Sequence, residues 1–186
     1  MKTEKEKMLS GELYNGFDEL LVNERMRTRL LLREFNDSNP EDTVIRKQIL
    51  KKLIPSQGES LWIEPPFQCD YGSNIETGDN VFFNFNCVIL DVMQVTIGSN
   101  VLLGPSVQIY TALHPMDFKV RASGLESGKP VRIGNHCWIG GGVIICPGVT
   151  IGDRTVIGAG SVVTRDIPED VFAAGNPCRV IRSLVS

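Results

Sequence analysis

The sequence predicts an all-β solenoid, a parallel β-helix with a short helical segment in front of it, and three observations support this fold class. The first is an aliphatic residue at every sixth position along one stretch: Ile133, Ile139, Ile145, Ile151, Ile157 and Val163. A period of six matches neither the 3.6-residue period of a helix nor the two-residue alternation of a strand. It is typical of a solenoid in which short strands alternate with turns.

The second observation is that the same phase extends upstream. It returns, 36 residues before Ile133, at Ile97, Leu103 and Ile109. A weaker copy, separated from these by a slip of two residues, comprises Tyr71, Thr77, Phe83 and Ile89. Three six-residue faces make one coil, so residues 60 to 180 predict roughly five to six coils. The third observation is the turn formers after these positions, such as Gly98-Ser99-Asn100 and Gly134-Asn135, which suit tight corners.

Two segments lie outside this pattern and define the expected domain organisation. Residues 1–56 form an N-terminal helical segment on the acceptor side, and residues 57–186 form the β-helix domain, interrupted by a loop at 111–130. The helical segment is expected to cover an exposed coil end, whose unpaired strand edges would otherwise invite aggregation.

Three helices are predicted in the N-terminal segment. Thr3 and Glu6 have the spacing of a capping box, and Asp18 is suited to cap a second helix. A third helix is expected to start at Asn39-Pro40 and to end near Pro55. The second helix has apolar positions that fall approximately on one face: Leu20, Leu21, Met26, Leu30 and Leu31.

Composition excludes several classes of function. A formal charge of -3 and the absence of a basic stretch argue against nucleic-acid binding. No apolar run approaches membrane-spanning length, and the first residues lack an apolar signal core. The five cysteines are scattered without a CxxC pair, which indicates neither a zinc site nor a disulfide framework. We therefore expect a cytoplasmic protein with reduced cysteines and no metal.

The loop at 111–130 is the best candidate for a functional segment, because interrupting a rigid solenoid costs packing. It contains His114, one of two histidines, followed by Pro115. An imidazole exchanges protons near neutral pH, so a histidine at a rigid loop base suits general base catalysis. A surface histidine without a role is an equally good interpretation from the sequence alone. His136 lies in a repeat corner and is expected to be a solvated turn residue.

Several strings carry a family resemblance. They include SGELY at 10–14, EPPF at 64–67, NFN at 84–86, YTALHP at 110–115 and AAGNPCRVIR at 173–182, together with the long repeat at 129–168. In this order the chain resembles the maltose/galactoside O-acetyltransferase group of the hexapeptide-repeat acetyltransferases. The motifs span nearly the whole chain. The resemblance implies a left-handed β-helix and transfer of an acetyl group from acetyl-CoA to a sugar hydroxyl.

The resemblance also implies catalytic roles. The family's general base falls on His114, and such a base contributes roughly 10²–10⁴-fold to the rate. A backbone N–H near the NFN motif, at Phe83 or Asn84, is expected to stabilise the oxyanion of the thioester carbonyl. Direct transfer is implied, without a covalent acyl-enzyme.

The acceptor site carries over from the family less evenly. Asn84 matches a sugar-contacting asparagine, and Asp70 falls where relatives have a small polar contact. Asp91 is a candidate ligand, although the ungapped match of the galactoside enzymes' second acid is Val92. Asp18 is either a ligand or only a helix cap, and Arg25 either reaches the acceptor or pairs with an acid. These departures favour a maltose- or glucose-type acceptor over a galactoside.

The acetyl-CoA site implied by the resemblance lies in a groove between neighbouring β-helices, and therefore implies a homotrimer. Its expected contacts are Trp138, Gly141, Ala159, Thr164, Arg165, Arg179 and Arg182. Small residues admit an extended pantetheine arm, and arginine suits phosphate oxygens. Trp138 is equally compatible with plain packing.

Other functions remain as alternatives. A galactoside or xenobiotic O-acetyltransferase shares the coil and the loop histidine. A non-catalytic scaffold or binding protein is the alternative from a different class. A carbonic anhydrase built on this coil requires three zinc-binding histidines, and this chain has two histidines in total.

Overall fold

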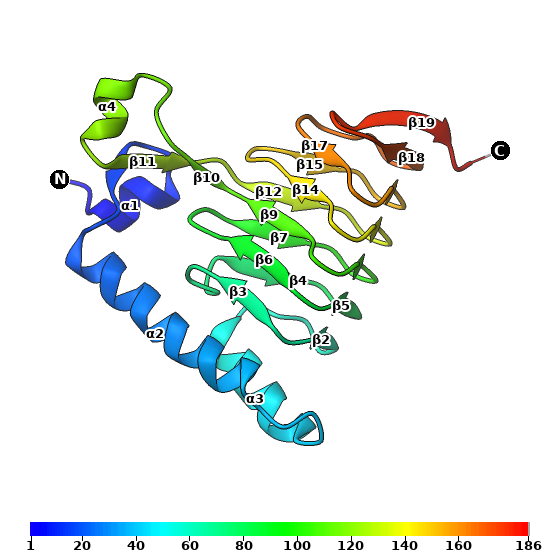
Figure 1. The fold of residues 1–186 in the computed structure, drawn as a ribbon, viewed down its shortest axis with the longest axis horizontal. Helices are drawn as coiled ribbons and strands as arrows, with labels where there is room; N and C mark the ends of the chain where they lie inside the picture. The colour runs from blue at the N-terminus through cyan, green and yellow to red at the C-terminus, as the bar shows by residue number, and fades with distance from the viewer. Residues whose placement is uncertain (186) are drawn as a thin grey trace.

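A computed structural model describes residues 1–185, and residues 57–185 of it form a β-helix whose strands stack from β2 to β18 (Figure 1). Parallel strands form three sheets, called faces 1, 2 and 3 from here on. Face 1 contains β4 (Ile75–Thr77), β7 (Val95–Ile97), β12 (Val131–Ile133) and β15 (Thr150–Ile151). Face 2 contains β2 (Leu61–Ile63), β5 (Val81–Phe83), β8 (Leu102–Leu103), β13 (Trp138–Ile139), β16 (Val156–Ile157) and β18 (Val171–Ala174). Face 3 contains β3 (Phe67–Cys69), β6 (Cys87–Leu90), β9 (Gln108–Tyr110), β14 (Ile144–Ile145) and β17 (Val162–Val163).

The six-residue period points side chains inward, as predicted. Every aliphatic position of the stretch from Ile133 to Val163 is at most 2% exposed. The weaker upstream copy is also buried, with Thr77 at 5% and Phe83 at 0% exposed. About six coils result, in agreement with the prediction.

Three irregularities of the period fall at the same corner, between face 3 and face 1. Inward positions normally lie six apart, but Cys69 to Thr77 and Ile89 to Ile97 each span eight residues. In the next coil the same corner holds the whole 111–130 loop. Paired strands are therefore 20 residues apart in the first coils, 36 across the loop and 18 afterwards: Phe82↔Leu102, Leu102↔Trp138 and Trp138↔Val156. This 3–1 corner is where the chain has room to depart from the coil.

The corner between faces 1 and 2 shows why glycine and Asn or Asp recur there. Asn135 Oδ1 accepts from the Ser99 N–H at 2.9 Å, and Asp153 Oδ1 accepts from the Asn135 N–H at 2.7 Å. A Cβ on Gly134 would lie 2.3 Å from that Asp153 oxygen. Only glycine leaves space for a side chain of one coil to bind the backbone of the next.

The helical segment confirms two predicted caps. In α1 (Glu4–Leu9), Thr3 and Glu6 form a capping box, and Asp18 accepts from two N–H groups at the start of α2 (Glu19–Asn36). The predicted start of the third helix is wrong, because α3 covers Thr43–Leu53 with Asp42 as N-cap. Asn39 instead accepts from the Glu41 N–H and closes a separate turn before the helix.

The predicted apolar face of α2 is only partly correct, because Leu21 is buried and Leu31 packs against the core, whereas the other three positions are exposed. Leu20, Met26 and Leu30 are 50%, 51% and 63% exposed. The buried residues are Leu21, Thr28, Leu32 and Phe35, which follow the i, i+7, i+11, i+14 spacing of a helix stripe. Thr28 belongs to this stripe because its hydroxyl donates to the Tyr71 carbonyl at 2.9 Å, a contact that hydrophobicity alone does not reveal.

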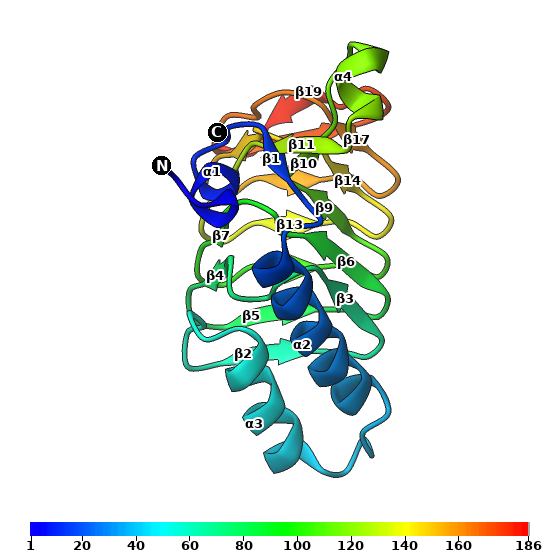
Figure 2. The ribbon, with the colours of Figure 1, turned by 90° about the vertical axis from the view of Figure 1, so that its left-hand side faces the viewer.

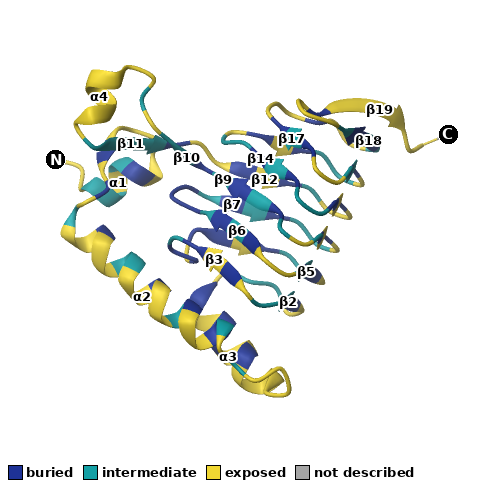
Figure 3. Cartoon of the chain, viewed as in Figure 1, coloured by how far each residue is buried: buried dark blue, intermediate teal, exposed yellow. Residues whose placement is uncertain are grey.

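The helices cover the first coil and one side of the solenoid (Figure 2). Leu32 and Phe35 from α2, and Ile49 and Leu53 from α3, join the same core cluster as the inward residues of the coils, so one core runs across residue 56. The remaining faces of α2 and α3 are largely exposed (Figure 3). At the other end, β19 (Arg179–Ser183) pairs antiparallel with β18.

Candidate active site

The N-terminal segment and the long loop meet beside the 3–1 corner. In the loop, β10 (Ala112–Leu113) pairs antiparallel with β11 (Leu125–Gly128), and α4 (Phe118–Ala122) lies between them. On its other edge β11 pairs with β1 (Tyr14–Asn15), Tyr14 opposite Glu126. The loop is therefore held by a three-stranded sheet against the helical segment.

A cavity of about 160 Å³ opens where these elements meet the corner. It is called the acceptor cavity below, after the predicted acceptor residues Arg25 and Asp70 that line it, and its other lining residues are Tyr14, Arg29, Val92 and Glu126. Two carboxylates and two guanidinium groups in one hollow provide donors and acceptors suited to a polyhydroxylated molecule.

Arg25 on α2 donates hydrogen bonds to two segments beside this cavity. Its Nη1 donates to the Tyr71 hydroxyl and its Nη2 to the Gly16 carbonyl, each at 2.6 Å. The guanidinium also lies over the Tyr71 ring, 5.7 Å from the centroid. Arg25 lines the cavity, and among residues 1–185 it has no acid within ion-pair distance.

Asp70 and Asp91 occupy different positions relative to the cavity. Asp70 lines it, and burial raises the pKa of its carboxyl. Asp91 has no exposed surface; its Oδ1 accepts from the N–H groups of Asp70 at 2.9 Å and Tyr71 at 3.0 Å. Burial raises the pKa of Asp91 to about 7. Asp91 therefore stabilises the corner from its buried side by these hydrogen bonds, whereas Val92 lines the cavity.

Asp18 acts in the structure as a helix cap. Its Oδ1 accepts from the N–H groups of Leu20 at 3.1 Å and Leu21 at 3.4 Å. The side chain is half-buried and does not belong to the lining of the acceptor cavity.

His114 is exposed at the end of β10. The hairpin register pairs Leu113 with Ser127, and His114 follows directly after this last pair, while Glu126 precedes Ser127. Glu126 Oε2 in turn accepts from the Tyr14 hydroxyl at 2.9 Å. The histidine is thus carried by the same hairpin that lines the acceptor cavity. His136 is exposed with a φ of 57°, as expected of a turn residue.

A second group of predicted residues collects at the corner between faces 2 and 3. Asn84, Gly141 and Ala159 follow β5, β13 and β16 of face 2, and the coil of β8 lies between those of β5 and β13. The neighbouring Gly160 has a positive φ, and a Cβ there would meet no atom within 4 Å, so this corner is open to an approaching chain. Trp138 flanks it on face 2 and is 57% exposed.

One oxyanion assignment is corrected by the hydrogen bonding. The Asn84 N–H donates to the Leu103 carbonyl at 3.0 Å, as part of the ladder between coils, and is not free. Phe83 is fully buried within β5. The Asn84 Oδ1 accepts from the Phe85 N–H at 2.8 Å, and among residues 1–185 its Nδ2 has no protein partner. The side-chain amide is therefore the available donor at this position.

The remaining predicted residues lie near the last coils. Thr164 and Arg165 are exposed on the 3–1 corner after β17. Arg179 and Arg182 are on β19, where Arg182 lies over the Phe172 ring at 5.9 Å. Because β19 pairs antiparallel with β18, Arg179 lies opposite Ala174 beside the 2–3 corner.

Sequence reasoning missed three residues of the acceptor cavity: Tyr14, Arg29 and Glu126. Arg29 lies one helical turn after Arg25, and that spacing was a usable signal. No local pattern marks Glu126, because its place depends on the hairpin register within an irregular loop.

The comparisons with known proteins decide the family. A family model described as the maltose acetyltransferase hexapeptide capping motif matches residues 7–58, and a bacterial transferase hexapeptide model of six repeats matches residues 130–165. The galactoside O-acetyltransferase of Escherichia coli is 46% identical over 96% of this chain and 88% of its own. The chain belongs to the hexapeptide-repeat acetyltransferases.

Two solved structures of the hexapeptide-repeat acetyltransferases are close neighbours. A maltose O-acetyltransferase from Clostridium difficile is 54% identical, covers 100% of this chain and 99% of its own, and has a TM-score of 0.98. An acetyltransferase from Vibrio cholerae, complexed with acetyl coenzyme A, is 40% identical, covers both chains completely and has a TM-score of 0.92. The fold is the left-handed β-helix of these enzymes, and acetyl-CoA is the co-substrate.

Two further findings concern residues 1–185. None of their helices is long and apolar enough to cross a membrane. No cluster of three or more His, Cys, Asp or Glu side chains in this part of the chain is arranged to bind a metal ion.

Proposed function

We propose that this acetyltransferase transfers an acetyl group to a sugar hydroxyl, of the maltose or glucose type, at a site shared by two subunits of a homotrimer. The observation that carries the proposal is the separation of the candidate residues into two groups. His114 and Asp70 belong to the 3–1 corner, with Arg25 of α2 beside Asp70, whereas Asn84, Gly141 and Ala159 belong to the 2–3 corner of the stack. A triangular coil holds two of its corners apart, so the groups meet when a second chain supplies one of them.

The outer surface of face 2 supports such an assembly. The strand register places a ladder of apolar side chains along it: Trp62, Phe82, Leu102, Trp138, Val156 and Phe172. Leu102 and Trp138 are 51% and 57% exposed. Face 1 carries a polar ladder instead: Glu76, Thr96, Arg132 and Thr150. An apolar stripe of this length is typical of a surface covered by another subunit.

In the proposed reaction the acceptor hydroxyl attacks the thioester carbonyl of acetyl-CoA. The new C–O bond forms as the C–S bond breaks, and CoA leaves as a thiol. The imidazole of His114 takes the hydroxyl proton and returns it to the departing sulfur. In this proposal the Asn84 Nδ2, which has no partner among residues 1–185, donates a hydrogen bond to the reacting groups from the neighbouring subunit. Asp91 holds the Asp70 corner from behind, and Asp70, Arg25 and Glu126 bind acceptor hydroxyls.

The cysteines favour direct transfer over an acyl-enzyme. All five are free, and burial raises the pKa of each thiol. A thiol of raised pKa forms less thiolate, which is the nucleophilic species.

The test is thiol release from acetyl-CoA with glucose, maltose, galactosides and chloramphenicol as acceptors, followed by subunit mixing. His114→Ala is expected to lower acceptor-dependent release by roughly a hundredfold or more. Asn84→Ala is expected to be strongly impaired as well. When the two inactive variants are unfolded together and reassembled in equal amounts, roughly a quarter of the sites pair one intact His114 with one intact Asn84, and that activity returns.

A mixture that stays inactive after reassembly would contradict the shared site. The control is His114→Ala mixed with His114→Phe, which regenerates no intact pair and therefore no activity. Release without any acceptor dependence would contradict the acetylation of a hydroxyl.

A further inference from the structure

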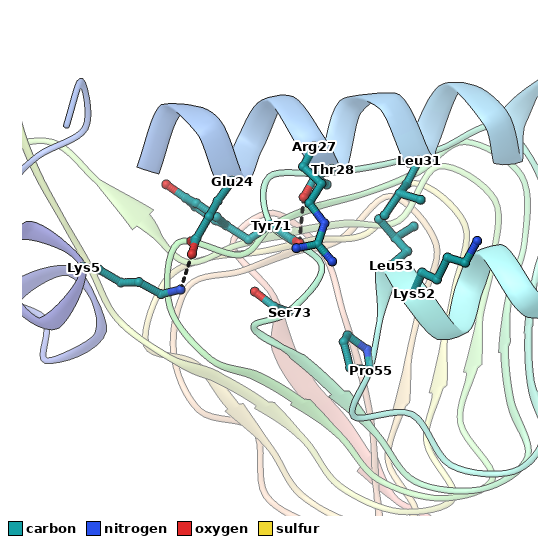
Figure 4. Close-up of a pocket in the computed structure, with 10 residues that line it drawn as sticks. All are labelled: Lys5, Glu24, Arg27, Thr28, Leu31, Lys52, Leu53, Pro55, Tyr71 and Ser73. Atoms are coloured by element: carbon teal, nitrogen blue, oxygen red, sulfur yellow. Dashed lines mark hydrogen bonds and ion pairs between the residues drawn. The ribbon is translucent and has the colours of Figure 1, made fainter. Parts of the chain in front are cut away.

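A second cavity lies between the helical segment and the β-helix, and it shares no lining residue with the acceptor cavity (Figure 4). It has a volume of about 250 Å³ and is enclosed by α1, α2, α3 and the corner after β3. Tyr71 forms part of its wall, and the Tyr71 hydroxyl faces Arg25 of the acceptor cavity.

Cationic side chains from three helices surround this cavity. Lys5 comes from α1, Arg27 from α2 and Lys52 from α3. Figure 4 shows the Arg27 guanidinium directed into the hollow, with Lys5 and Lys52 at opposite ends. Lys5 pairs with Glu24 at 2.5 Å, which neutralises one charge. Within residues 1–185, Arg27 and Lys52 have neither an ion-pair partner nor a side-chain hydrogen bond. Two positive charges therefore remain without a counter-anion.

One carboxylate oxygen of Glu24 lacks a hydrogen-bond donor within the described chain. Its Oε1 takes the bond from Lys5, but its Oε2 is buried and has no partner in the described chain. A buried carboxylate oxygen without a donor is unfavourable, and a hydroxyl group of a bound molecule satisfies it. The exposed Ser73 hydroxyl lines the same hollow and accepts or donates as required.

We propose that this cavity binds a small phosphomonoester that carries hydroxyl groups, of which a sugar phosphate is the simplest example. The phosphate, with a charge of about −1.5 to −2 at neutral pH, matches the two unpaired cations Arg27 and Lys52. A hydroxyl of the same molecule donates to Glu24 Oε2. The site is separate from the proposed acceptor cavity and from the proposed acetyl-CoA groove.

The test is isothermal titration calorimetry at low ionic strength with glucose 6-phosphate, inorganic phosphate and glucose, each added to the protein saturated with coenzyme A and maltose, which cannot react with each other. Saturation occupies both proposed substrate sites, so binding that remains reports on a further site. We expect glucose 6-phosphate to bind more than tenfold tighter than either inorganic phosphate or glucose. Arg27→Gln and Lys52→Gln are each expected to weaken it at least tenfold.

Matched controls come from the same helices. Arg33→Gln on α2 and Lys51→Gln on α3 remove one exposed charge each outside the cavity, and are expected to leave the affinity unchanged. Equal weakening by the controls, inorganic phosphate binding as tightly as glucose 6-phosphate, or no heat of binding would each overturn the proposal. Acetyl transfer by Arg27→Gln and Lys52→Gln is measured separately, so the failure of this site is distinguishable from the failure of the proposed function.

Discussion

Replacing Asp91 by asparagine tests the account of the 3–1 corner through the pH dependence of stability. The Asp91 carboxyl has no exposed surface, and its pKa is raised from 3.8 to about 7 by burial. The folded protein therefore holds this proton more tightly than the unfolded chain does. The stabilisation is fully present below pH 3.8, declines as the pH rises through the window from 3.8 to about 7, and is lost above it.

The magnitude follows from the two pKa values. Between pH 5 and pH 8 the free energy of unfolding of the wild type is expected to fall by roughly 2–3 kcal/mol because of Asp91. In Asp91→Asn the amide oxygen still accepts from the Asp70 and Tyr71 N–H groups, but nothing titrates at this position. The pKa of Asp70 is also raised, and its contribution has the same sign in both proteins. The difference between the two pH profiles therefore isolates Asp91.

The assay is urea unfolding followed by circular dichroism at pH 5 and pH 8, at one fixed protein concentration because subunit association contributes to stability. The control is Asp37→Asn, whose side chain is 76% exposed at the end of α2 and is expected to leave the wild-type profile unchanged. If Asp91→Asn loses as much stability as the wild type between the two pH values, the assignment of a protonated, buried Asp91 is refuted.

The remaining predictions concern packing and the acceptor cavity. Leu21→Ala is expected to cost about 2–5 kcal/mol of unfolding free energy, and Leu30→Ala less than about 0.5 kcal/mol, because only Leu21 faces the core; equal costs by urea unfolding would contradict the observed orientation of α2. Gly134→Ala is expected to lower the melting temperature, because the added Cβ would lie 2.3 Å from Asp153 Oδ1, and an unchanged melting temperature argues against the side-chain ladder. Tyr71→Phe removes the 2.6 Å bond from Arg25 and is expected to raise the KM for the acceptor without changing the KM for acetyl-CoA, measured by thiol release; parallel changes in both would show that Tyr71 acts on the whole fold.

The N-terminal segment shows where local reasoning succeeds and where it stops. The caps at Thr3 and Asp18 depend on hydrogen bonds between residues two or three apart, so the sequence contains all the information needed to predict them. The buried face of α2 depends on what the helix packs against. Thr28 is buried because Tyr71, 43 residues later in the chain, offers its carbonyl there.

The candidate site divides in the same way. The resemblance placed residues on the chain, and the structure showed which of them are accessible. Asp91 is buried beneath the corner, and the Asn84 N–H is hydrogen-bonded to the next coil. Glu126 lines the cavity because of the hairpin register, which no periodic pattern in the sequence indicates.

The sequence by itself determined the coil, because a six-residue period is local and repeats the same packing at every rung until one interpretation remains. Only the tertiary structure decided that the two short slips and the long loop share one corner, since this depends on how successive coils are stacked. It also placed Asp70 and His114 at the 3–1 corner, and Asn84, Gly141 and Ala159 at the 2–3 corner, of one rigid stack of coils. That separation is a property of the closed triangular coil and not of any single stretch of residues. Positions six apart along the chain lie on different faces, because the chain turns a corner between them.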